Sequence, residues 1–213
     1  MRGEDQRESP QTQGIRYSSK VRGKVIEVKY PWQENENLYL PIQKHTNRVI
    51  VLNTFPSVPV IGDGVITSLK GVEIGVRTAD CAPVVFVGNE WVGVIHAGWR
   101  GLASGILEKA LERLSHYERI EELFVFIGPS AKSCCYEVGE ELRNLFSPYV
   151  VERDGKLYMD LQSVAMMELR SMGVKNIGVL ELCTVCSTHL PSYRRDKTSE
   201  RLLTSVKIER DYP

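Results

Sequence analysis

The sequence predicts one α+β domain, in which a mixed β-sheet and flanking helices form a three-layer arrangement. Three observations support this class: a sizeable apolar fraction, several short strand-like runs that adjoin without a helix between them, and three helical patterns. The chain has 213 residues, 42% of them apolar, which is enough for one full hydrophobic core. No linker-like stretch or internal repeat divides it. We therefore expect a single domain over residues 1–213, with a polar, weakly ordered N-terminus at residues 1–20.

Seven short runs either alternate in hydrophobicity or are continuously apolar, as is typical of β-strands. Several follow one another directly, so the sheet should be mixed or partly antiparallel. The predicted strands lie near residues 23–30, 48–52, 72–78, 84–88, 91–95, 123–127 and 177–181.

Three segments place apolar residues at helical spacing, near residues 101–115, 138–147 and 161–171. Asp160 is a good N-cap for the third helix, because its carboxylate can accept from a free backbone N–H of the first turn. Gly173 is a suitable stop for the same helix.

The charge balance excludes a global electrostatic attraction to nucleic acid or to an anionic membrane. Lys plus Arg and Asp plus Glu both total 27, so any selectivity for anions must be local. No apolar run reaches about 18 residues, the length that would indicate a membrane span. Residues 1–14 are polar throughout, and the five cysteines are an odd number. We expect a soluble cytoplasmic protein, a monomer or a homodimer.

His45, Cys81 and His96 together are a suitable ligand set for one catalytic zinc ion. Two imidazoles and one thiolate leave the fourth tetrahedral position open to water or substrate. The three residues are far apart in sequence, so tertiary structure must bring them together. Copper would bind the same set in vitro, but imidazole and thiolate suit zinc best. The alternative is a buried free cysteine with two ordinary histidines.

The neighbourhoods of Cys81 and His96 favour a site. Cys81 lies at the junction of two predicted strands, and His96 ends a strand where the chain turns into a helix. Arg100 follows in that turn, where an anion could meet both a guanidinium and a helix N-terminus. The alternative for Arg100 is a surface ion pair.

Several uncommon strings recur in order over residues 43–201, about three quarters of the chain. By these strings the chain resembles the laccase-domain family, also called the YfiH or peptidoglycan-editing-factor family, of purine nucleoside phosphorylases. The matching strings are Gln43-Lys44-His45, Asp63-Gly64 with Thr67, Thr78-Ala79-Asp80-Cys81-Ala82-Pro83, His96-Ala97-Gly98-Trp99-Arg100-Gly101, Ile127-Gly128-Pro129-Ser130, Cys134-Cys135-Tyr136-Glu137-Val138-Gly139, Cys183-Thr184 and Ser192-Tyr193-Arg194-Arg195-Asp196.

The resemblance implies a zinc-dependent enzyme whose metal ligands are His45, Cys81 and His96. Its implied reaction is phosphorolysis of adenosine, inosine or S-methyl-5′-thioadenosine to base plus ribose 1-phosphate, with adenosine deamination as a related activity. Arg100 or Arg48 would orient phosphate, and Arg194 and Arg195 would either bind phosphate or form a solvated charge pair. Asp80, beside the thiolate, would act as an acid or base or would orient a ligand. One departure is the segment 22–40, which is shorter than in the family.

Three other functions remain open at this point. Copper-dependent polyphenol oxidation has been linked to the family, but four histidines are too few for a multicopper cluster. A peptidoglycan-precursor editing hydrolase would use Cys81 as nucleophile and His96 as base. A zinc-stabilised binding module would fold with metal but catalyse nothing.

The remaining cysteines and histidines are expected to have structural or incidental roles. Cys183 and Cys186 form a Cys-x-x-Cys pair, which could hold a second metal or act as a redox pair, but no second such pair completes a four-thiolate zinc site. Cys134 and Cys135 are expected to be partly buried thiols, since neighbouring cysteines bridge only with strain. His116 and His189 are expected to face solvent or to be structural.

Overall fold

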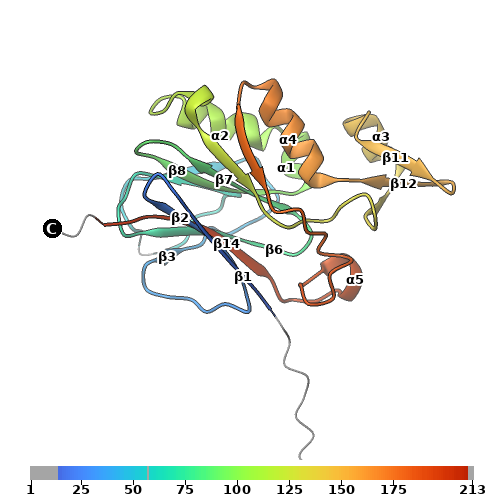
Figure 1. Cartoon of the computed structure of the whole chain (residues 1–213), viewed down its shortest axis with the longest axis horizontal. Coiled ribbons are helices and arrows are strands. Elements are labelled where there is room, and N and C mark those ends of the chain that lie inside the picture. The colour runs from blue at the N-terminus through green and yellow to red at the C-terminus, as the bar shows by residue number, and fades with distance from the viewer. Residues whose placement is uncertain (1–13, 57, 211–213) are drawn as a thin grey trace, which may run out of the picture.

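Two β-sheets pack face to face, and helices cover the outer face of one of them (Figure 1). The structure is a computed structural model that describes residues 14–56 and 58–210. The layers are a five-stranded sheet, a six-stranded sheet and helices. The α+β class with mixed sheets and flanking helices is therefore confirmed.

The five-stranded sheet has the order β1-β2-β14-β6-β3. Its pairs are antiparallel except β3 with β6, which is parallel. Its strands are β1 (Ile15–Val21), β2 (Lys24–Tyr30), β3 (Leu38–Tyr39), β6 (Glu73–Thr78) and β14 (Leu202–Ile208).

The six-stranded sheet has the order β13-β9-β7-β8-β5-β4. Its two outer pairs, β13 with β9 and β4 with β5, are parallel, and the inner pairs are antiparallel. Its strands are β4 (Val49–Leu52), β5 (Gly64–Thr67), β7 (Ala82–Val87), β8 (Val92–Ala97), β9 (Phe124–Ile127) and β13 (Asn176–Val179).

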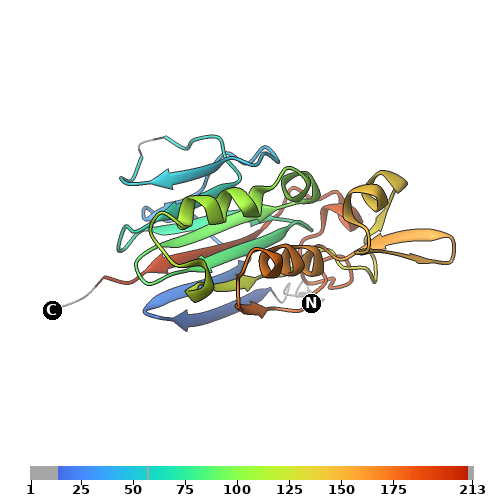
Figure 2. The same cartoon turned by 90° about the horizontal axis from the view of Figure 1, so that it is seen from above.

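The helical layer lies on the six-stranded sheet, and a small third sheet projects beyond it (Figure 2). Helices α2 (Ile106–Leu114) and α4 (Leu161–Ser171) run across the sheet, and α1 (Trp99–Ala103) precedes α2. The small sheet, in the order β10-β12-β11, lies beside α3. The other elements are η1 (Ile120–Glu122), β10 (Glu137–Val138), α3 (Glu140–Phe146), β11 (Val150–Arg153), β12 (Lys156–Met159) and α5 (Tyr193–Asp196).

Strand β7 contributes side chains to two hydrophobic clusters, one on each face of its sheet. Successive strand residues point to opposite faces. Val84 and Phe86 accordingly pack in the cluster under the helices, whereas Val85 and Val87 pack in the cluster between the sheets. Every residue of β7 is buried, which explains its continuously apolar sequence.

The seven predicted strands are all present, and so are the helices predicted near residues 138–147 and 161–171. Asp160 caps α4 by accepting a hydrogen bond from Ser163 N at 3.1 Å, and Gly173 follows that helix with φ 93°. The helix predicted over residues 101–115 is instead two helices. Gly105 between them has φ 77°, a left-handed conformation that interrupts the helix.

The prediction of a weakly ordered N-terminus is wrong for its last residues. Residues 15–21 form β1, which pairs along its whole length with β2. Tyr17 of this strand stacks on Phe126, with ring centroids 5.2 Å apart. Residues 1–13 lie outside the described residues. Among the described residues, no helix is both long enough and apolar enough to cross a membrane.

Candidate functional site

His45, Cys81 and His96 converge at one edge of the two-sheet core. Cys81 lies between β6 and β7, where the chain crosses from one sheet to the other, and His96 belongs to the neighbouring strand β8. His45 lies in the loop before β4, with φ 57°. The nitrogen and sulfur ligand atoms of the three residues all lie within 4.8 Å of one another. The structure thus assembles the predicted ligand set.

Asp63, a fully buried residue, holds two of these three residues in place. One carboxylate oxygen accepts from His96 Nδ1 at 2.8 Å and from His45 N at 3.0 Å. The other accepts from the backbone N–H and the hydroxyl of Thr46, at 2.7 and 2.8 Å. Because Asp63 engages Nδ1, Nε2 is the His96 nitrogen left to serve as a ligand, as is usual when a carboxylate orients a metal-binding imidazole. Sequence reasoning placed Asp63 in a motif but gave it no role.

The protonation states in this cluster follow from burial opposed by close charges. Burial disfavours ionisation of Asp63, but hydrogen bonds from His96 and Thr46 outweigh it and hold its pKa well below the usual range. Burial would raise the pKa of Cys81, yet the charge of His96 and a hydrogen bond with His45 lower it to about 6.

For His96, burial lowers the pKa, but the Cys81 thiolate and Asp63 raise it to about 9. At neutral pH the metal-free cluster is therefore a thiolate facing an imidazolium.

Because Gly98 has no side chain, it leaves room for the Cys81 side chain. A Cβ atom added at Gly98 would lie 2.8 Å from Cys81 Sγ and 3.5 Å from His45 Cδ2. Only glycine fits beside these ligand atoms without displacing them. The chemistry of the donors, their mutual approach and their exposure on a cavity wall fit a zinc-like ion with an open fourth position.

The three residues line a cavity of about 700 Å³. Its wall is rich in cations, so an anion is favoured there. It also carries aromatic side chains, which can pack on the flat face of a heterocycle. The cations are Arg77, Arg100, Arg194, Lys197 and Arg201, and the aromatic residues are Trp99, Tyr136 and Tyr193.

Arg100 and Arg194 each lie close over an aromatic ring. The Arg100 guanidinium lies 4.3 Å from the centroid of the Trp99 ring, and that of Arg194 lies 4.8 Å from the centroid of Tyr136. Burial and the nearby Cys81 raise the pKa of Tyr136, so its phenol stays protonated at neutral pH. Arginine, unlike lysine, offers a planar fork that matches phosphate oxygens.

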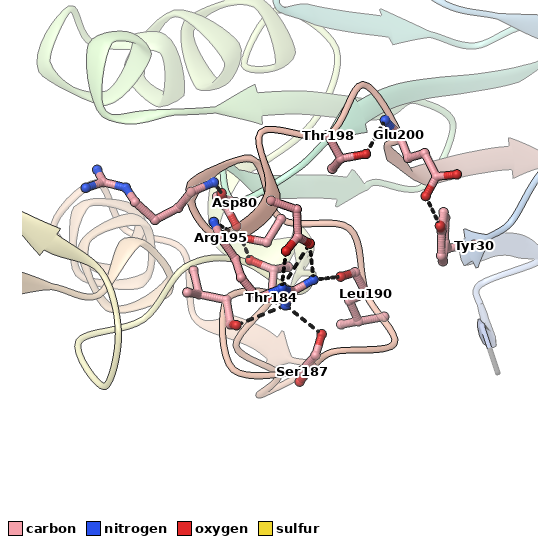
Figure 3. Close-up of polar contacts among 12 residues, drawn as sticks. Tyr30, Asp80, Thr184, Ser187, Leu190, Arg195, Thr198 and Glu200 are labelled. Atoms are coloured by element: carbon pink, nitrogen blue, oxygen red, sulfur yellow. Dashed lines mark hydrogen bonds and ion pairs between the residues drawn. The ribbon is translucent and has the colours of Figure 1, made fainter. Parts of the chain in front are cut away.

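Asp80 links the Cys81 loop to the C-terminal part of the cavity wall (Figure 3). It is buried, with φ 87°. One carboxylate oxygen accepts from the Thr184 hydroxyl at 2.7 Å, and the other accepts from Arg194 N at 2.6 Å. These contacts position the start of helix α5, which carries Arg194, whereas the carboxylate that orients a candidate metal ligand is Asp63.

Arg195 and Arg48 lie outside the set that lines the cavity. The Arg195 guanidinium donates to Asp196 and to four loop carbonyls, so it clamps the chain around itself (Figure 3). The four carbonyls belong to Thr184, Val185, Ser187 and Leu190. The Arg48 residue is exposed. The structure thus places Arg100 and Arg194, but not Arg195 and Arg48, among the residues that line the cavity.

The expectation about the other cysteines needs correction. Cys134 and Cys135 complete a group of four sulfur atoms with Cys183 and Cys186, although no second Cys-x-x-Cys exists. Cys135, expected to be a thiol, forms a disulfide with Cys186, and Cys134, expected to be partly buried, is a free cysteine that is exposed. The two pairs meet because β9 and β13, the strands that precede them, are parallel neighbours. His116 and His189 are exposed, as expected.

Residues 21–209 match the model of a protein family described as multi-copper polyphenol oxidoreductase laccase. The chain belongs to this family. A family member from Aquifex aeolicus named purine nucleoside phosphorylase is 56% identical over 173 residues, which cover 81% of this chain and 84% of that protein. The purine nucleoside phosphorylase YfiH of Escherichia coli is 31% identical, with coverages of 77% and 71%.

Solved structures agree with the fold. YlmD from Geobacillus stearothermophilus superposes with a TM-score of 0.75 at 28% identity, covering 82% of this chain and 74% of that one. A Neisseria meningitidis protein gives a TM-score of 0.79 at 21% identity, with coverages of 92% and 99%. The two-sheet architecture that carries the cluster is therefore the architecture of these proteins.

Proposed function

We propose that this protein is a metal-dependent purine nucleoside phosphorylase. The observation that carries the proposal is the cluster of His45, Cys81 and His96, open to a cavity whose wall combines arginines with aromatic rings. Relatives that bear this activity in their names, at up to 56% identity, support it. The proposed substrates are adenosine, inosine and S-methyl-5′-thioadenosine together with phosphate.

The cavity offers separate surfaces for the two substrates. A purine has a flat aromatic face, which Trp99, Tyr136 and Tyr193 can contact. Phosphate carries about two negative charges at neutral pH, and Arg100 and Arg194 present guanidinium groups on the same wall. Holding both reactants in one cavity converts a bimolecular reaction into an effectively unimolecular one.

In the proposed reaction a phosphate oxygen bonds to the ribose C1′, and the bond from C1′ to the purine nitrogen breaks. The electron pair of that bond leaves with the base, which gains a proton and departs neutral. Arg100 and Arg194 orient the phosphate, and Asp80 keeps the start of α5, which carries Arg194, beside the Cys81 loop. A zinc ion held by His45, Cys81 and His96 would supply positive charge and Lewis acidity at the cavity wall.

The test is a phosphate-dependent assay for free base and ribose 1-phosphate with each of the three nucleosides. Zinc-loaded wild type should release base only when phosphate is present, and Cys81→Ala should lose both the metal of this cluster and the activity. Release of neither product by zinc-loaded wild type from any of the three nucleosides would contradict the proposal.

Adenosine deamination is proposed as a related activity of the same cluster. It would replace the amino group at the purine C6 with oxygen from water, producing inosine and ammonia without phosphate. Formation of inosine in phosphate-free buffer, lost in Cys81→Ala, is the expected result. Its absence would restrict the protein to phosphorolysis.

One observation favours a second candidate, a peptidoglycan-precursor editing hydrolase. Asp63, His96 and Cys81 form a chain in which a carboxylate orients an imidazole beside a thiol of lowered pKa. That order of groups suits a nucleophilic cysteine with a histidine base. A nucleophile predicts activity that survives metal chelation and is abolished by alkylation, whereas a ligand predicts loss of activity with the metal.

The family's polyphenol oxidase description is not carried over to this chain. Of the four histidines, His45 and His96 belong to a candidate metal group of the described residues. Laccase chemistry needs several copper ions with mainly imidazole ligands. If the protein were a zinc-stabilised binding module, zinc would raise its stability but no substrate would be turned over. The phosphate-dependent assay also tests for such turnover.

A further inference from the structure

The four cysteines outside the cavity form a compact sulfur cluster. The Sγ atoms of Cys134, Cys135, Cys183 and Cys186 all lie within 4.8 Å of one another. Cys134 Sγ is 3.3 Å from Cys186 Sγ, and Cys135 is bonded to Cys186. In a tetrahedral zinc site with four thiolates, Zn–S bonds of about 2.3 Å place the sulfur atoms about 3.8 Å apart. The Cys135–Cys186 bond must open to reach that arrangement, and the 4.8 Å limit on the other separations leaves only small side-chain movements to reach it.

The backbone holds the two cysteine pairs side by side. Strands β9 and β13 pair in parallel, and their extensions meet at a bridge between Ser130 and Cys183. Ser130 N donates to Leu182 O at 3.2 Å, and Thr184 N donates to Ser130 O at 3.0 Å. The cluster therefore lies at the end of the hydrogen-bonded β9–β13 strand pair, whose backbone pairing brings the two cysteine pairs together.

Each pair is presented by a hydrogen-bonded turn. Ser187 N donates to Cys183 O at 3.0 Å, which closes the turn over the Cys-x-x-Cys segment. Cys135 N and Tyr136 N both donate to Lys132 O, at 3.1 and 2.9 Å, which closes the turn at the vicinal pair. Short turns that place two sulfur atoms on one side are the usual way in which proteins build structural zinc sites.

We propose that, in its reduced form, the protein binds a second metal ion, a zinc-like divalent cation, through the thiolates of Cys134, Cys135, Cys183 and Cys186. Reduction of the Cys135–Cys186 disulfide adds two electrons and two protons, supplied by a dithiol that itself becomes a disulfide. Binding of the cation then releases the four thiol protons as the four metal–sulfur bonds form. Four protein ligands leave no open position, so this site is structural and not catalytic.

The cluster is connected to the wall of the cavity. Tyr136, which lines the cavity, follows Cys135 directly in the chain. Thr184, between Cys183 and Cys186, donates its hydroxyl to Asp80, and its carbonyl accepts from Arg195. A metal that locks these two turns would fix the positions of Tyr136 and of helix α5, which carries Arg194.

The experiment measures metal in protein kept reduced with a phosphine. Wild type should bind about two zinc ions per chain. Each single variant, Cys81→Ala, Cys134→Ser or Cys186→Ser, should lose one site and bind about one zinc ion. The double variant Cys81→Ala/Cys186→Ser should bind none. Titration of Cys81→Ala with cobalt(II) should give an intense thiolate-to-metal charge-transfer band that saturates at one equivalent. The same band should vanish when Cys134→Ser is added to Cys81→Ala.

The proposal is overturned if reduced Cys81→Ala, folded by circular dichroism, binds no zinc and gives no charge-transfer band. In excess phosphine, Cys81→Ala should have four titratable thiols. Finding only two would mean that the Cys135–Cys186 disulfide persists, and this would also overturn the proposal. The outcome is separable from that of the proposed activity. A wild type with two zinc ions but no phosphorolysis would contradict the activity and support this site.

Discussion

The two sulfur-containing clusters differ in how they are built and in what they face. The cluster of His45, Cys81 and His96 draws its residues from three distant segments, mixes nitrogen with sulfur and opens to a cavity. The four-cysteine cluster draws on two turns, contains sulfur alone and lies outside the residues that line the cavity.

Their support differs as well. Asp63, buried in the core, orients His96 and the His45 loop, so the first cluster is built on strands and a carboxylate. Backbone hydrogen bonds close the two turns of the second, and the Arg195 guanidinium donates to carbonyls of the turn that holds Cys183 and Cys186. The comparison indicates that a site with three ligands and an oriented imidazole suits catalysis. A site with four thiolates suits holding two segments of the chain together.

The largest expected effect is the loss of activity when a proposed metal-ligating histidine is replaced, compared with replacement of an exposed histidine outside both clusters. His45→Ala should reduce phosphorolysis by about a thousandfold, because loss of the metal removes several kcal/mol of transition-state stabilisation. His116→Ala is the matched control, since His116 is exposed and belongs to neither cluster, and it should retain full activity. The measurement is kcat/KM for adenosine with saturating phosphate. Equal losses in the two variants would contradict the assignment of His45.

The next effect tests the carboxylate that supports only the first cluster. Asp63→Asn should weaken zinc binding there by about 10- to 100-fold, as is typical when the partner of a ligand histidine is changed. The measurement is competition with a chromophoric chelator in the Cys186→Ser background, which isolates this cluster. Asp160→Asn, which keeps the helix cap of α4, is the control and should not alter the affinity. An unchanged affinity in Asp63→Asn would show that Asp63 acts on folding alone.

A smaller effect is expected at Gly98. In Gly98→Ala the new methyl group would overlap Cys81 Sγ, so the sulfur must shift by a few tenths of an ångström. Zinc affinity in the Cys186→Ser background should fall several-fold, while circular dichroism shows the fold retained. An affinity equal to that of Cys186→Ser itself would mean that the ligand geometry tolerates the displacement.

The smallest perturbation is a change of pH, which contrasts the thiols of the two clusters. In metal-free protein that keeps the Cys135–Cys186 disulfide, the alkylation rate of Cys81 should be half-maximal near pH 6, because the lowered pKa provides thiolate at neutral pH. Burial and the neighbouring Cys183 raise the pKa of Cys134, so its alkylation should rise only under alkaline conditions. Mass spectrometry of the alkylated peptides measures both rates. A Cys81 rate that also rises only in the alkaline range would contradict the thiolate–imidazolium pair.

Much of the fold could be predicted because local patterns report burial. The alternation in residues 72–78 and the apolar run in 84–88 indicated β6 and β7, and Asp160 and Gly173 indicated the ends of α4. The two-residue strands β3 and β10 could not be predicted, because their pairing depends on partners far along the chain. Gly105 divided a helix whose apolar spacing continued across it.

The candidate site was predictable where residue chemistry is distinctive. Histidine and cysteine are uncommon, so His45, Cys81 and His96 could be selected by residue type and local sequence. Asp63 and Arg195 could not be interpreted, since carboxylates and arginines are common and only tertiary contacts show what they hold. The four-cysteine cluster was hidden because its two pairs are 51 residues apart at the disulfide and meet through tertiary structure, in which β9 pairs with β13.

The most direct test of the central claim uses Cys186→Ser, in which the first cluster alone should hold metal. Its protein is stripped with a chelator, assayed for phosphorolysis of adenosine, reloaded with zinc and assayed again. A catalytic metal centre predicts activity that disappears on stripping and returns in proportion to zinc, reaching its plateau at one equivalent. Full activity in the stripped protein, abolished by alkylation of Cys81, would contradict a metal centre and assign Cys81 as a nucleophile.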